Sequence, residues 1–186
     1  MKYLTFILVL FISSVSDTHY PEKYDKLINK EITKLFGKTE IVKNQLDIPD
    51  TLSFSDDNSM YHLKINDSIV GIMAINKVNA CKVNGCSKPD PFYAGRYDHF
   101  YYFVVFDTNY SILKIKVLDY QSDYGYEICS KSWLTQFIGQ KGCKLSYGNE
   151  IDAISGATVS GNAIVTDVQL ICELIKKMDN LEILSY

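Results

Sequence analysis

This 186-residue chain has few histidines, no large excess of either charge and few long apolar runs. Its 19 basic and 22 acidic residues leave a net charge of −3, so nothing favours nucleic acid or an anionic membrane surface as a partner. His19, His62 and His99 have no cysteine, serine or carboxylate at catalytic or ligand spacing, and no metal site is predicted. The sequence also lacks a P-loop, a dinucleotide fingerprint and a G-x-S-x-G motif. These absences disfavour an NAD-dependent enzyme that acts alone.

The one marked apolar run lies at the N-terminus. Lys2 precedes apolar residues from Tyr3 to Ile12, and residues 14–16 (Ser-Val-Ser) offer a small-residue cleavage site. Residues 1–16 are therefore predicted to be a signal peptide, which places the protein in the periplasm or on the outer face of the cytoplasmic membrane. An uncleaved N-terminal anchor is the alternative, because a single lysine makes a weak basic region. The run is short for a membrane span of about 20 residues, and no later segment is long enough.

Five cysteines in an exported chain imply disulfides and one leftover thiol. Cys172 falls beside Val168 and Ile175 on a predicted helix, and we expect it to be the buried, unpaired one. Sequence leaves three pairings open for the other four cysteines. They are Cys81, Cys86, Cys129 and Cys143.

Cys81 and Cys86 stand four residues apart in a segment rich in glycine, proline and lysine. Their spacing differs from the C-x-x-C motif of redox-active dithiols, and two cysteines alone do not make a zinc site. A structural disulfide between Cys81 and Cys86 is therefore favoured over a dithiol that exchanges electrons.

Apolar periodicity predicts helices separated by β-hairpins. The predicted elements are a helix at 24–36 ended by Gly37, a hairpin of 61–65 with 69–78, a hairpin of 99–106 with 110–120, a short helix at 132–137, a helix at 158–178 and a short strand at 181–184. This order indicates an α+β fold. We divide the chain into the signal segment 1–16, an N-terminal helix with its connecting loop at 17–58, and a domain at 59–186.

Residues 152–158 (Asp-Ala-Ile-Ser-Gly-Ala-Thr) carry the clearest chemical pattern. Ser155, Gly156 and Ala157 are small, which lets a bulky group approach the backbone. The Thr158 hydroxyl then lies at or just before the start of a predicted helix, where free amides and the helix dipole favour a phosphate. Asp152 does not suit a phosphate contact, because like charges repel. The alternative is an ordinary helix start, since Ser, Thr and Asp are preferred there and Gly is common in turns.

This segment resembles the D-x-x-S/T-G-A-T signature of the FMN-binding domain family, which includes the FMN-binding subunits of the sodium-pumping NADH:quinone reductase and of the Rnf complex. The resemblance implies a small twisted antiparallel β-sheet packed with helices. It also implies that a flavin transferase joins FMN to Thr158 through a phosphoester bond, with Ser155, Gly156 and Ala157 around it. Asp152 would then serve attachment, by holding a cation or orienting the hydroxyl in the transferase.

The resemblance extends over residues 61–178 and includes the run Gln136-Phe137-Ile138-Gly139. One departure concerns the loop before the short helix, where many members have E-T-P-G-x-G. This chain has Asp-Tyr-Gly-Tyr-Glu at residues 123–127. Gly125 would keep the close approach to the flavin and Tyr124 would stack on its ring, or the segment is a plain turn with surface tyrosines.

The sequence thus predicts an exported flavoprotein that carries electrons rather than a stand-alone enzyme. Its expected partners are the flavin transferase and membrane electron-transfer proteins, and it would be membrane-associated through them or through an uncleaved anchor. Two alternatives stay open. One is a thiol–disulfide redox protein that uses Cys81 and Cys86, and the other is a binding domain that keeps the fold without the flavin.

Overall fold

The computed structural model describes residues 20–49, 51–52, 58–82 and 97–184. The elements run in the following order: η1 (Glu22–Tyr24), α1 (Asp25–Phe36), β1 (Val42–Gln45), β2 (Ser59–Ile65), β3 (Ser68–Lys82), β4 (Tyr97–Phe106), β5 (Ile112–Tyr120), η3 (Tyr126–Cys129), α2 (Lys131–Thr135), η4 (Gly142–Lys144) and α3 (Thr158–Asn180).

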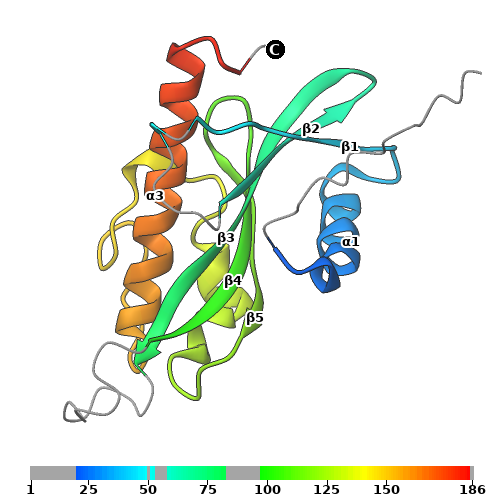
Figure 1. Ribbon diagram of the computed structural model, residues 1–186. Coiled ribbons are helices and arrows are strands. Elements are labelled where there is room, and N and C mark those ends of the chain that lie inside the picture. The colour runs from blue at the N-terminus through cyan, green and yellow to red at the C-terminus, as the bar shows by residue number, and fades with distance from the viewer. Residues whose placement is uncertain (1–19, 50, 53–57, 83–96, 185–186) are drawn as a thin grey trace, which may run out of the picture.

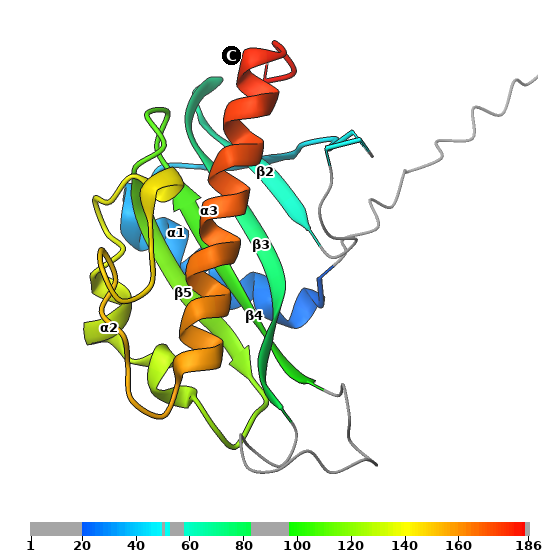
Figure 2. The same ribbon diagram turned by 90° about the vertical axis from the view of Figure 1, so that its left-hand side faces the viewer.

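Five antiparallel strands form one open sheet in the order β1-β2-β3-β4-β5. Figures 1 and 2 show the sheet strongly twisted, with α3 lying across one face and α1 on the other. The short η3–α2 segment lies on the α3 side, near β5. This arrangement confirms the predicted α+β fold, an antiparallel sheet packed with helices.

Strand β4 is apolar from Phe100 to Phe106 because both of its faces pack against a core there. Phe100, Tyr102, Val104 and Phe106 face the core under α3, whereas Phe103 and Val105 face the smaller core under α1. Alternate side chains of a strand point to opposite faces, so one run of aromatic and branched residues serves both cores. The site described below is built on the α3 side.

The helices predicted at 24–36, 132–137 and 158–178 and both predicted hairpins are present. The predicted strand at 181–184 is wrong. Those residues form a turn in which the Ile183 amide donates to the Met178 carbonyl, while Leu184 is buried against the core. The chain also contains β1, in a stretch expected to be loop. Three of its four residues are polar and three are exposed, so only backbone pairing with β2 reveals it.

The expectation that Cys172 is unpaired is also wrong. Cys172 is fully buried, as predicted, but it forms a disulfide with Cys143, whose Cα lies 5.1 Å away. Its helix face meets η4, which carries Cys143 to the same part of the core. Cys129 is a free, exposed thiol.

Several predictions lie outside the described residues. They include the signal segment at 1–16 and the proposed Cys81–Cys86 disulfide, since Cys86 and the side chain of Cys81 are not described. Among the helices that the structure describes, none combines the length and apolar character needed to cross a membrane.

Candidate functional site

The predicted signature lies at the start of α3, at the end of the molecule where β3 and β5 end and β4 begins (Figures 1 and 2). Thr158 is the first residue of the helix, and its side chain is exposed. Gly156 is exposed and has a φ of +84°, a backbone angle that other residues rarely adopt. Ser155 and the Asp152 side chain are exposed, whereas Ala157 is fully buried. The structure therefore leaves Thr158 exposed directly after a turn that glycine makes possible.

The N-terminus of α3 has no side-chain cap. Ala157 occupies the capping position and has no side-chain acceptor. The first amides of a helix lack partners within the helix, and in a 23-residue helix they lie at the positive end of a strong dipole. This helix start is therefore suited to bind a phosphate group.

Helix α2 holds the beginning of the signature through its backbone. The Trp133 indole N–H donates to the carbonyl of Asp152 over 2.9 Å. The amide of Asp152 donates to the side-chain oxygen of Gln136, also over 2.9 Å. Gln136 belongs to the run that the sequence resemblance singled out, and this bond gives it a structural role. The backbone of Asp152 is thus fixed while its carboxylate remains exposed.

Tyr147 holds the middle of the signature. Its hydroxyl accepts a hydrogen bond from the Ile154 amide over 2.9 Å and donates to the Ile154 carbonyl over 3.4 Å. The Tyr147 ring occupies space beside Gly161 on the first turn of α3. A Cβ atom on Gly161 would lie 2.6 Å from a ring carbon, so only glycine leaves room for the ring. Sequence reasoning missed this pair, because its members are far apart in the chain and neither belongs to a motif.

A second loop reaches the same helix start through Tyr120. The Tyr120 hydroxyl lies 2.8 Å from the Ser160 hydroxyl and donates to the carbonyl of Tyr124. Tyr120 therefore links the carbonyl of Tyr124 to the first turn of α3. Tyr124 is 52% exposed. Stacking of Tyr124 on a flavin stays a prediction.

Glu127 is an acidic neighbour of the signature that sequence reasoning missed. Its Oε1 atom would lie 3.3 Å from a Cβ on Gly156, and its Oε2 atom is buried without a hydrogen-bond partner in the described part of the chain. A carboxylate here repels a phosphate, so the fit at this edge depends on a cation or on a hydrogen-bond donor of the bound group. The only sequence signal was its place at the end of the divergent 123–127 loop.

Comparison with known proteins gives one family match. The family model for the FMN-binding domain matches residues 95–172, a range that contains the signature, the loop at 123–127 and α2. No curated protein matches the chain. The exposed threonine, the glycine turn and the uncapped helix start fit the phosphate end of FMN. The match over residues 95–172 supports an FMN-binding domain in this chain, with FMN as its cofactor.

Proposed function

We propose that this protein is an exported electron carrier in which FMN is joined to Thr158 through a phosphoester bond. The observation that carries the proposal is the placement of Thr158. Thr158 is an exposed residue at the start of a long helix without a side-chain cap, inside the region that matches the family. A phosphodiester keeps one negative charge, which the amides and dipole of the helix start would stabilise.

The bound flavin would supply the redox chemistry, and the protein would supply attachment, orientation and electrostatics. Gly156 would allow the phosphate to approach the backbone, and Tyr147 and α2 would keep the signature in one conformation. Tyr124 would offer an aromatic face to the ring system. Each of these contributions depends on the rigidity of the loop rather than on flexible side chains.

The two carboxylates at the site would have different tasks. Asp152 is exposed, so it is accessible to a maturation enzyme and would hold a cation or orient the Thr158 hydroxyl during attachment. Glu127 is packed against Gly156 with one oxygen buried. It would therefore act on the attached cofactor through its charge rather than on the attachment reaction.

Export and partners are part of the proposal and follow from the N-terminal segment and the resemblance. A covalent bond is useful outside the cytoplasm, where a lost cofactor cannot be replaced. The flavin transferase would load the protein there, and membrane electron-transfer proteins would exchange electrons with it.

The test is a redox titration of protein purified from a host that also expresses a flavin transferase. We expect visible flavin absorbance that bleaches on reduction and returns on oxidation, and that survives removal of small molecules from unfolded protein. Thr158→Ala should abolish this absorbance. Thr166→Ala, an exposed threonine on the same helix, is the matched control and should keep it. Equal colour in both variants would overturn the attachment site, and a colourless wild type would favour the binding-domain alternative.

The variants Cys81→Ser and Cys86→Ser, measured in the same titration, distinguish the flavin carrier from a thiol–disulfide redox protein. If both variants load and titrate like the wild type, the two thiols have no part in the electron transfer. The disulfide that the structure does contain, Cys143–Cys172, joins η4 to α3 and gives this alternative no support.

A further inference from the structure

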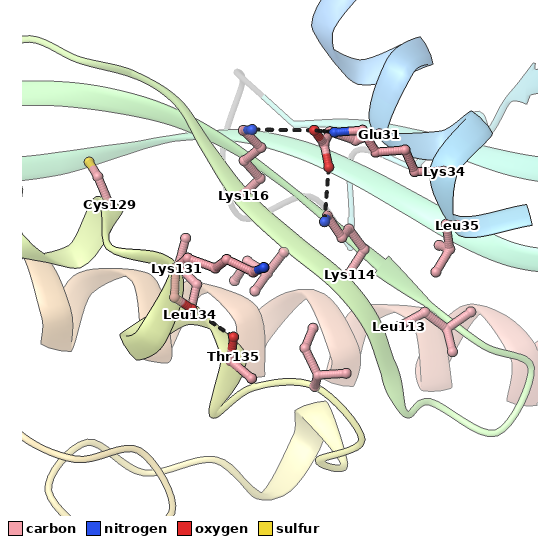
Figure 3. A pocket seen from close by; sticks show the side chains of 12 residues that line it. Glu31, Lys34, Leu35, Leu113, Lys114, Lys116, Cys129, Lys131, Leu134 and Thr135 are labelled. Carbon is pink, nitrogen blue, oxygen red and sulfur yellow. Dashed lines mark hydrogen bonds and ion pairs between the residues drawn. The ribbon is translucent and has the colours of Figure 1, made fainter.

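A groove of about 560 Å³ lies between α1 and α2, along strand β5 (Figure 3). Its volume falls in the range of ligand-binding pockets in proteins. Apolar side chains from three elements line it: Leu35 from α1, Leu113 and Ile115 from β5, and Leu134 from α2. Ile138, just after α2, adds a side chain that is 44% exposed. Ile115 and Leu134 are themselves buried in the core, so the open apolar surface of the groove comes from Leu35, Leu113 and Ile138.

The charged residues of the groove are four lysines and one glutamate. Glu31 is buried and pairs with Lys34 at 2.8 Å, Lys114 at 2.9 Å and Lys116 at 3.4 Å. These lysines hold the pKa of Glu31 down at about 2, so the carboxylate is ionised at neutral pH. One carboxylate cannot neutralise three ammonium groups, and Lys131 has no ion pair with any described residue. The groove is thus cationic, although the chain has a net charge of −3.

Strand β5 is the last strand of the sheet, and its outer edge is open along the groove. At its start, Ile112 pairs with residues 139 and 140 through two backbone hydrogen bonds. Among the described residues, no backbone hydrogen bond joins 113–119 to anything other than β4. An open strand edge is a template on which an extended peptide can add as a further strand.

Helix α2 lies between this groove and the signature: one side of the helix contacts the signature, and the other side lines the groove. Trp133 and Gln136 hold the backbone of Asp152. Lys131 and Leu134, on the other side of the helix, line the groove. A partner seated in the groove would therefore lie one short helix away from the signature.

We propose that this groove is the docking site of an acidic, extended polypeptide segment of a partner protein, which pairs with the open edge of β5. Carboxylates of the segment would meet Lys34, Lys114, Lys116 and Lys131. Alternate apolar side chains would cover Leu35, Leu113 and Ile138. Charge complementarity selects the acidic segment, and the open edge favours an extended peptide over a small anion. This inference does not require the chain to carry flavin.

The experiment measures binding of a fluorescein-labelled peptide of alternating glutamate and valine residues to the full chain by fluorescence anisotropy. We expect saturable binding that weakens steeply as salt rises. Lys131→Glu should weaken it by about tenfold or more, because the reversal adds repulsion where no ion pair is broken. Lys30→Glu is the matched control: Lys30 is exposed on α1 but does not line the groove, and this variant should bind as the wild type does.

Two further measurements identify the mode and the class of ligand. A peptide with N-methyl groups on the amides that would face β5 should lose binding, and the unmodified peptide should protect the free amides of residues 113–119 from hydrogen exchange. Absence of binding, equal loss in the Lys131 and Lys30 variants, or full binding of the methylated peptide would overturn the proposal. So would preferential binding of inorganic phosphate or of phosphatidylglycerol vesicles, each of which would assign the groove to a different anion.

Discussion

Replacing Gly161 with alanine tests how the signature is held. Alanine in a helix interior is normally more stable than glycine by about 1 kcal/mol. Here the added Cβ would lie 2.6 Å from the Tyr147 ring and 3.0 Å from its hydroxyl oxygen, so the ring must move. Overpacking of this kind costs about 1 to 3 kcal/mol. We therefore expect Gly161→Ala to lower the free energy of unfolding by up to about 2 kcal/mol, where propensity alone would raise it.

The displaced ring would also lose its bond to the Ile154 amide. Tyr147→Phe removes that bond without adding volume and should cost about 1 to 2 kcal/mol, because a partly buried donor loses its partner. Since Gly161→Ala already breaks the bond, the double variant should cost less than the sum of the two single ones. A coupling of about 1 kcal/mol is expected.

Urea unfolding at equilibrium gives all three free energies, and hydrogen exchange of the Ile154 amide reports the bond directly. Asn162→Ala, at an exposed position of the same helix turn, is the control and should be stabilising by roughly 0.5 kcal/mol. The reasoning is refuted if Gly161→Ala stabilises the protein as this control does, or if the costs of the two site variants simply add.

Three other predictions concern stability. Ion pairs lower the pKa of Glu31 to about 2, so the contribution of Glu31 to the free energy of unfolding is complete above about pH 4.5 and is lost as pH falls toward 2. Glu31→Gln should remove this pH dependence, which is worth roughly 2 kcal/mol because the lysines are partly exposed and solvent screens them. Urea unfolding measured across this pH range checks the prediction, and the same dependence on pH in the variant would contradict it. Reducing the Cys143–Cys172 disulfide, which closes a separation of 29 residues, should cost roughly 3 to 4 kcal/mol in urea unfolding, and no change on reduction would count against it. Burial raises the pKa of Asp167, a carboxylate that accepts hydrogen bonds from Tyr102 and Asn76. Protonated Asp167 therefore stabilises the fold at low pH, and this stabilisation is lost as pH rises from about 4 through the raised pKa. Asp167→Asn should flatten this part of the profile, and an unchanged slope would refute the assignment.

The sequence predicted the elements that carry a clear apolar pattern. The α3 face formed by Ile164, Val168, Ile171 and Ile175 is buried as its spacing indicated. The apolar run of β4, from Phe100 to Phe106, packs against a core on each face of the sheet. The signature was predicted to precede α3 and does, because small residues and a helix start are both local properties of the chain.

The sequence could not predict contacts between segments that are distant in the chain. Cys172 was predicted to be a core residue and is one. Its disulfide partner Cys143 lies on the short helical turn η4, which has no periodic apolar pattern, so the sequence did not indicate the pairing. Glu127 and Tyr147 reach the signature only after the fold brings their loops together. Strand β1 has no apolar alternation, since its stability comes from backbone pairing with β2.

The central claim is that Thr158 is the attachment point of FMN. The most direct measurement is the intact mass, under denaturing conditions, of protein from a host that expresses a flavin transferase. We predict a gain of about 440 Da, the mass of FMN less water, in the wild type and in Thr166→Ala, and no gain in Thr158→Ala. Absence of the gain in folded wild-type protein, or the same gain in Thr158→Ala, would contradict the account.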